Sequence, residues 1–296
     1  HTFAAMAHKS GFVNIVGSPN VGKSTLMNQL VGEKLSIVTS KAQTTRHRIL
    51  GIVNDEDHQI VFSDTPGVVN VSYKLHENMM EYVSVSLQDA DVLLFVTDTV
   101  EQKMNHEATL ERIKKLNVPV LCLINKVDKS HQEKVAERIQ YWKDEIPNAE
   151  VYPISALHNF NIDIVWDRIL SLIPENPPYY DKDELSDRPM RFFVSEIIRE
   201  KIFNFCQKEI PYSSQIEIEM YEDTVHLIRI RAIIIVERDS QKGIIIGKGG
   251  EMLKKIGRQA RIDIQKFLDK KVFLETFVKV DKDWRSSEAK LKKYGY

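Results

Sequence analysis

Up to about residue 173 the chain alternates short, continuous apolar runs with amphipathic segments. The apolar runs predict buried strands at 12–16, 59–63, 92–97, 120–125 and 151–154. The segments between them carry helical periodicity and predict helices at 24–31, 75–87, 105–116, 132–143 and 162–172. An antiparallel edge strand is expected at 47–53. Strands without alternation are typical of a mostly parallel sheet covered on both faces, with ligand loops at the carboxyl ends of its strands.

The pattern changes after a stretch rich in proline and acidic residues. A helix is expected at 191–206, and 214–222 alternates strictly, with Ile216, Ile218 and Met220 on one face. A second alternating strand at 225–236, a glycine-containing turn, a helix with an apolar face from 253 to 267 and a strand at 272–280 complete an α-β-β-α-α-β order. We therefore predict the following division: a leader at 1–9, an α/β domain at 10–174, a linker at 175–190 and an α+β domain at 191–296.

Net charge differs sharply between the two parts, although the whole chain carries a formal charge of only −1. Residues 188–296 hold 23 Lys and Arg against 16 Asp and Glu, a net charge of +7, and the preceding residues hold 18 against 26, a net charge of −8. The basic part is the one expected to contact a polyanion. The two cysteines, Cys122 and Cys206, exclude a disulfide framework and indicate a reducing cytosol. No apolar stretch approaches the roughly 20 residues that cross a bilayer, and His1 to Ala5 look like an expression-vector remnant.

Residues 17–24 fit the pattern G-x-x-x-x-G-K-S between a predicted strand and a predicted helix. In that setting the glycines let backbone N–H groups surround an anion at the helix N-terminus. Lys23 can then neutralise the outer phosphates and the Ser24 hydroxyl can ligate Mg²⁺. The residues expected to contact a nucleotide here are Gly17, Ser18, Pro19, Asn20, Val21, Gly22, Lys23, Ser24 and Thr25.

A second motif indicates which base is bound. Asn125, Lys126 and Asp128 follow a predicted strand and match the N-K-x-D element of GTP-binding proteins. The Asp128 carboxylate can accept two hydrogen bonds from guanine, whereas adenine would leave it unsatisfied. Asn125 and Lys126 are expected to connect the base loop to the phosphate loop. After the next predicted strand, Ser155, Ala156 and Leu157 resemble the loop whose backbone N–H, here that of Ala156, contacts guanine O6.

Two segments between these motifs predict a response to the γ-phosphate. Asp64, Thr65, Pro66 and Gly67 match D-x-x-G after a predicted strand, so that Asp64 can hold the Mg²⁺ shell and the Gly67 N–H can reach the γ-phosphate. Upstream, Thr45 is the expected Mg²⁺ ligand of a switch segment, and Thr44 is the alternative. The predicted metal ligands are thus Ser24, Thr45 and Asp64.

In the basic domain, residues 247–250 fit a G-x-x-G loop between two helices. Glycines there allow a single-stranded nucleic acid backbone to approach the main chain, and lysine supplies charge for phosphates. A tight turn between helices is the alternative interpretation. The residues expected to contact RNA are Ile246, Gly247, Lys248, Gly249, Gly250 and Lys254. This domain resembles a type II KH domain.

The combined motifs and the domain pair closely resemble the Era GTPases, from about Lys9 onward. The resemblance implies a Ras-like P-loop domain followed by a KH domain, and a monomer that binds GTP or GDP with Mg²⁺. It further implies binding of the single-stranded 3′ region of 16S ribosomal RNA, not DNA, and a role in maturation of the small (30S) ribosomal subunit. A cytoplasmic location with peripheral contact to the inner membrane is also implied. Ser18 departs from the family, whose members often carry Arg at this position.

The residue after D-x-x-G is Val68, where Ras-like switches place a water-orienting Gln, so unaided hydrolysis is expected to be slow. In the family, a potassium ion held by the loop Asn, here Asn20, can stabilise the developing charge. The alternative for Asn20 is a turn former beside Pro19. The expected catalytic residues are Asn20, Lys23, Thr45 and Gly67.

Two rival functions remain open at the level of the sequence. One is an RNA-binding protein in which GTP is a structural cofactor and hydrolysis is incidental, which Val68 permits. The other is a Der-type assembly GTPase. Der-type proteins carry two G domains and lack a working G-x-x-G, whereas this chain has one G domain and an intact loop.

Overall fold

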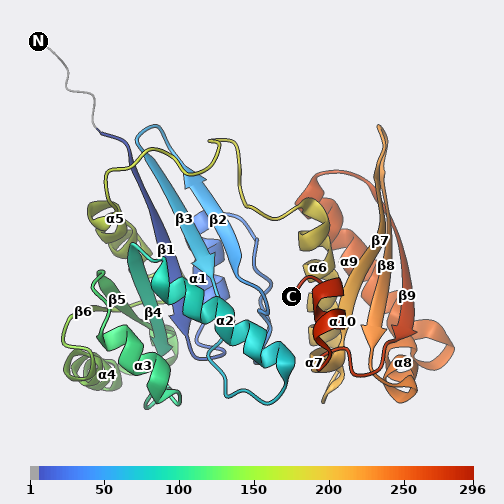
Figure 1. The fold of residues 1–296 in the computed structure, drawn as a ribbon, viewed down its shortest axis with the longest axis horizontal. Coiled ribbons are helices and arrows are strands. Elements are labelled where there is room, and N and C mark those ends of the chain that lie inside the picture. Colours follow the sequence, from blue (N-terminus) through green and yellow to red (C-terminus); the bar gives the residue numbers. More distant parts are fainter. Residues whose placement is uncertain (1–6) are drawn as a thin grey trace, which may run out of the picture. The chain divides into compact units, whose positions relative to one another are not determined.

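The computed structural model describes residues 7–296, so most of the predicted leader lies outside the described residues (Figure 1). The chain divides into two compact units. The first contains the N-terminal residues up to Ser36 together with Thr45–Val71 and Met79–Asp187. The second contains Ile37–Thr44, Ser72–Asn78 and Arg188–Tyr296.

The first unit is built on a six-stranded sheet of order β2-β3-β1-β4-β5-β6. Its strands are β1 (Lys9–Gly17), β2 (Ile49–Asn54), β3 (His58–Asp64), β4 (Val92–Asp98), β5 (Val120–Asn125) and β6 (Ala149–Pro153). All neighbours are parallel except β2, which pairs antiparallel with β3. The predicted mostly parallel sheet and its antiparallel edge strand are therefore confirmed.

Helices cover both faces of this sheet, because each presents an apolar stripe to it. They are α1 (Lys23–Val31), α2 (Lys74–Gln88), α3 (Glu107–Lys114), α4 (Gln132–Glu145) and α5 (Ile162–Leu172). Buried side chains of α1 and α5 pack with one set of strand residues, and those of α2, α3 and α4 with the other. The phosphate-loop, D-x-x-G and N-K-x-D motifs consequently meet at the carboxyl ends of β1, β3 and β5.

The second unit places helices on a three-stranded sheet of order β7-β8-β9. Its elements are α6 (Met190–Phe205), α7 (Ile210–Ser213), β7 (Gln215–Asp223), β8 (Ile228–Val236), α8 (Asp239–Ile246), α9 (Glu251–Leu268), β9 (Val272–Val280) and α10 (Glu288–Lys293). β7 and β8 are antiparallel and β8 and β9 are parallel. The predicted apolar face of α9, including Ile256, Ala260 and Ile264, lies in the core of this unit.

One predicted face assignment in β7 is wrong. The strand carries a register shift between Ile218 and Met220, so the strict alternation expected from the sequence breaks there. Met220 consequently pairs with Arg231, and Tyr221 instead packs against the core. A bulge of this kind inserts one residue and exchanges the two faces beyond it.

Within the second unit, the buried guanidinium of Arg199 joins α6 to the segment Ile37–Thr44. Its Nε and Nη2 donate to the Glu196 carboxylate at 2.8 and 2.6 Å, and Nη2 also donates to the Thr44 carbonyl oxygen at 2.5 Å. The Thr44 hydroxyl lies within hydrogen-bond distance of Thr39 Oγ1, at 2.6 Å, and of the Lys41 carbonyl oxygen, at 2.8 Å. The carbonyl oxygen and the hydroxyl of Thr44 are therefore both hydrogen-bonded inside this unit.

Among the described residues, no helix is both long enough and apolar enough to cross a membrane.

Candidate functional site

The phosphate loop curves tightly between β1 and α1. Its shape requires glycine where a Cβ would clash, and residues that tolerate a positive φ. Gly22 has φ +100, and a Cβ there would lie 2.1 Å from Asn125 Nδ2. At Gly17 a Cβ would lie 2.1 Å from the Val96 carbonyl oxygen. Asn20 has φ 63, a left-handed conformation that asparagine tolerates better than most residues. This backbone supports the interpretation of Asn20 as a turn former.

Lys23 is buried and its ammonium group donates to the Ser18 carbonyl oxygen at 2.7 Å. Burial lowers the pKa of Lys23 to about 8, although Asp64 and Glu101 oppose the shift. A phosphate placed in the loop would favour the charged form of this side chain. Ser24 and Thr25 follow in the first turn of α1, whose free N–H groups favour an anion.

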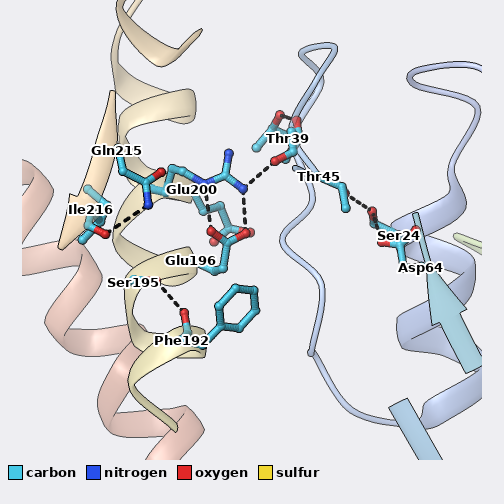
Figure 2. A network of polar contacts seen from close by, with 12 residues as sticks. Ser24, Thr39, Thr45, Asp64, Phe192, Ser195, Glu196, Glu200, Gln215 and Ile216 are labelled. Atoms are coloured by element: carbon cyan, nitrogen blue, oxygen red, sulfur yellow. Dashed lines mark hydrogen bonds and ion pairs between the residues drawn. The ribbon is translucent and has the colours of Figure 1, made fainter. Parts of the chain in front are cut away.

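Ser24, Thr45 and Asp64 converge, as expected for ligands of one ion (Figure 2). Ser24 Oγ donates to Asp64 Oδ2 at 2.7 Å and lies 2.9 Å from Thr45 Oγ1. Asp64 is fully buried, which raises the pKa of its carboxyl, and its Oδ1 has no hydrogen-bond partner within residues 7–296. Two hydroxyls and a buried carboxylate oxygen without a partner form an oxygen donor set that suits Mg²⁺. Because the Thr44 hydroxyl is engaged elsewhere, the geometry favours Thr45 over Thr44.

The D-x-x-G segment lies directly against the phosphate loop. Thr65 Oγ1 donates to the Ile15 carbonyl oxygen at 2.7 Å, and the Val68 N–H donates to the Gly17 carbonyl oxygen at 3.1 Å. At Gly67, which follows Pro66, a Cβ would lie 2.7 Å from Pro19 Cα. Only glycine therefore allows the two segments to lie this close. The Val68 side chain is 6% exposed and packs in the core. It therefore offers no group that could orient a water.

Asn125 connects three of the predicted motifs. Its Nδ2 donates to the Val21 carbonyl oxygen at 2.9 Å, and its Oδ1 accepts from the Ala156 N–H at 2.9 Å. Lys126 also contacts the phosphate loop, because its ammonium donates to the Asn20 carbonyl oxygen. The Ala156 amide is thus engaged by Asn125, and its contact with guanine O6 stays a prediction. Leu157 follows it in an exposed position.

The Asp128 carboxylate is held by two residues of the loop after β6. Its Oδ1 accepts from Ser155 Oγ at 2.7 Å, and its Oδ2 lies 3.6 Å from His158 Nε2. The Ser155 hydrogen bond lowers the pKa of the Asp128 carboxyl, which keeps the group ionised and able only to accept hydrogen bonds. An acceptor pair of this kind matches two adjacent N–H groups on guanine.

Two acidic residues, Asp98 at the end of β4 and Glu101 in the turn after it, were missed at the level of the sequence. Asp98 Oδ2 accepts from Lys126 Nζ at 2.9 Å, and the Glu101 carboxylate accepts from Ser18 Oγ. Neither belongs to a motif with fixed spacing. The available signal was positional, because the carboxyl end of β4 lies at the same edge of the sheet as the motifs.

The G-x-x-G loop of the second unit has the backbone that glycine permits. Gly247, Gly249 and Gly250 have φ values of 71, 60 and 78. A Cβ on Gly247 would lie 2.8 Å from Met252 Cβ, whereas at Gly249 and Gly250 nothing lies within 4 Å. The outer side of the loop is therefore open to an approaching chain. Lys248 and Lys254 are exposed, and Ile246 is half-buried.

Comparisons with known proteins agree with this arrangement. A family model described as a 50S ribosome-binding GTPase matches residues 12–126, and a KH domain model matches residues 209–285. A GTPase Era of Clostridium kluyveri is 46% identical over 97% of this chain and 99% of its own length. A GTPase Era of Staphylococcus haemolyticus is 43% identical over 98% of this chain and 97% of its own length.

Two solved structures share nearly the whole fold, each with a TM-score of 0.93 and 40% identity. One is Era in complex with MgGDPNP and nucleotides 1506–1542 of 16S ribosomal RNA, and covers 98% of this chain and 99% of its own. The other is an Aquifex aeolicus Era variant bound to GDP and AlF₄⁻, and covers 97% of this chain and 99% of its own. The predicted fold class, a Ras-like domain followed by a KH domain, is confirmed. The chain belongs to the Era family of GTPases.

Proposed function

We propose that this GTPase binds GTP with Mg²⁺ in its first unit and the single-stranded 3′ region of 16S ribosomal RNA in its second, and thereby assists small-subunit maturation. The observation that carries the nucleotide part is the position of Asn125, which hydrogen-bonds both the phosphate loop and the Ser155–Ala156 loop. The loop proposed to bind the phosphates and the loop proposed to bind the base are thus joined through one side chain. The related Era structure that contains MgGDPNP and 16S RNA supports the pairing of the two ligands.

In this site each residue has a defined task toward the nucleotide. The loop amides and Lys23 bind the β- and γ-phosphates, and Asp128 selects guanine. Ser24, Thr45 and Asp64 supply the oxygen ligands for Mg²⁺, which when bound neutralises charge on the phosphates. Gly67 lies against Pro19 of the phosphate loop, and its N–H is the group proposed to respond to the γ-phosphate.

Potassium is proposed as a second cation, because Val68 cannot orient water and Asn20 lies in the phosphate loop. Turnover is expected to rise several-fold when K⁺ replaces Na⁺ at constant ionic strength. The positive φ of Asn20 determines which substitution is suitable for the test. Asn20→Gly keeps this backbone accessible and removes the amide, whereas Asn20→Ala would add strain. Asn20→Gly is expected to retain nucleotide affinity and to turn over equally in both salts. Equal rates of the parent in K⁺ and Na⁺ would remove the cation from the mechanism.

The RNA part of the proposal relies on the open G-x-x-G loop and the net charge of +7 on residues 188–296. Single-stranded RNA is recognised by such loops through its backbone, with lysines at the phosphates. A cytoplasmic location and a monomeric state belong to the same proposal. A peripheral contact with the inner membrane rests on the family resemblance alone.

The rival in which GTP is a structural cofactor makes a different prediction for turnover. We expect slow but multiple turnover by the full chain, faster in the presence of a 16S 3′ RNA fragment. The measurement is phosphate release with GTP in large excess over protein, with and without RNA. Release that stops after one equivalent would favour the structural cofactor.

A further inference from the structure

The turn after β4 has a fixed shape and faces the nucleotide motifs. Asp98 Oδ1 accepts from the N–H groups of Val100 and Glu101 at 3.0 and 2.9 Å, which closes the turn. This brings two carboxylates, from Asp98 and Glu101, to the edge of the sheet where the phosphate loop lies. Carboxylates close to a phosphate site are unfavourable unless hydrogen bonds or ion pairs stabilise them. The residues that contact Asp98 and Glu101 therefore indicate the role of these two carboxylates.

The Glu101 carboxylate is held by two hydroxyl groups. Its Oε2 accepts from Thr97 Oγ1 at 2.6 Å, and its Oε1 accepts from Ser18 Oγ. Ser18 is the second residue of the phosphate loop, and its carbonyl oxygen accepts from Lys23 Nζ at 2.7 Å. Ser18 is therefore fixed through its side chain by Glu101 and through its backbone by Lys23.

Asp98 reaches the same loop through Lys126. The ion pair between Asp98 Oδ2 and Lys126 Nζ measures 2.9 Å, and the same ammonium donates to the Asn20 carbonyl oxygen. The turn thus contacts the phosphate loop at two points, directly at Ser18 and through Lys126 at Asn20. All of these residues belong to the first unit.

We propose that Glu101 is a positioning residue of the nucleotide site, which holds the phosphate loop in its binding shape through Ser18. A loop that is already ordered loses less conformational entropy when the phosphates bind, so its affinity is higher. Glu101 does not contact the nucleotide, and its effect reaches GTP and GDP alike. This inference rests on the proposed nucleotide site and adds to it an element without a motif.

The test combines single and double substitutions in the full chain. Ser18→Ala and Glu101→Ala are each expected to weaken fluorescent GDP and GTP analogues about tenfold, as expected for loss of a hydrogen bond to a charged group. The double variant should lose no more than either single one, because both remove the same contact. Glu101→Gln should recover most of the affinity, since its amide oxygen still accepts from a hydroxyl. Glu107→Ala, an exposed carboxylate in α3, is the matched control and should bind like the parent.

A merely structural role would give a different pattern. It would lower the melting temperature of the nucleotide-free variants, which we expect to stay within a few degrees of the parent. Additive losses in the double variant, or full affinity in Ser18→Ala or Glu101→Ala, would overturn the inference. A parent that binds neither analogue would instead overturn the proposed function, so the two failures are distinguishable.

Discussion

Replacing Asp128 by asparagine is expected to weaken GTP binding by about 100-fold and to favour xanthosine triphosphate. The carboxylate is fixed by Ser155 Oγ and ionised, so it can accept two hydrogen bonds from guanine. Each such bond to a charged group contributes about 1.5–3 kcal/mol, and asparagine would oppose one guanine N–H with its own amide. Xanthine has an oxygen at C2 and requires a donor there, which asparagine supplies.

Competition titration of both nucleotides against a fluorescent GDP analogue measures this exchange. Asp167→Asn is the matched control, because it makes the same change at an exposed position of α5. It should leave both affinities unchanged. If Asp128→Asn binds GTP as tightly as the parent, base recognition lies elsewhere.

The double variant Lys248→Asp and Gly249→Asp is expected to weaken single-stranded RNA by 10-fold or more. It replaces a cation by carboxylates where we propose that RNA phosphates pass, and it adds side chains on the open side of the loop. The fold should tolerate the change, since nothing lies within 4 Å of a Cβ on Gly249 and aspartate tolerates φ near 60. Affinity for GTP should stay nearly unchanged, because the nucleotide motifs lie in the other compact unit.

A charge-matched control separates the loop from the basic surface in general. Lys292→Asp with Gly295→Asp makes the same change in charge near the C-terminus, again at a glycine with positive φ and open space. This control should bind RNA like the parent, apart from a small uniform loss. Equal losses in both double variants would mean that only overall charge attracts RNA.

The first unit could be predicted closely from the sequence, because its strands are continuous apolar runs and its motifs have fixed spacing. The second unit was harder. The short helices α7 and α10 carry too few residues for a periodic pattern, and the bulge at Ile218 and Met220 is invisible in an alternating strand. The observed ends of some elements also differ from the predicted ones. The helix predicted at 105–116, for example, begins at Glu107 and is capped by His106.

In the candidate site, too, some residues could be predicted from the sequence and others could not. Ser24, Asp64 and Asn125 were selected by motif. In the structure Ser24 is hydrogen-bonded to Asp64, and Asn125 is hydrogen-bonded to the phosphate loop. Glu101 was not foreseen, because its importance comes from a contact with Ser18 across 83 residues of sequence. Such contacts depend on how the turn after β4 closes, which no local pattern of residues encodes.

The central claim is that this GTPase binds the 3′ end of 16S RNA at its G-x-x-G loop. A crosslinking map tests this claim most directly. The full chain, loaded with a non-hydrolysable GTP analogue, is crosslinked to a photoreactive RNA of the 16S 3′ end, and the crosslinked residues are identified by mass spectrometry. Our account predicts that the crosslinks cluster at residues 246–254 and disappear in the Lys248→Asp and Gly249→Asp variant. Crosslinks confined to residues 10–174, or unchanged in that variant, would contradict it.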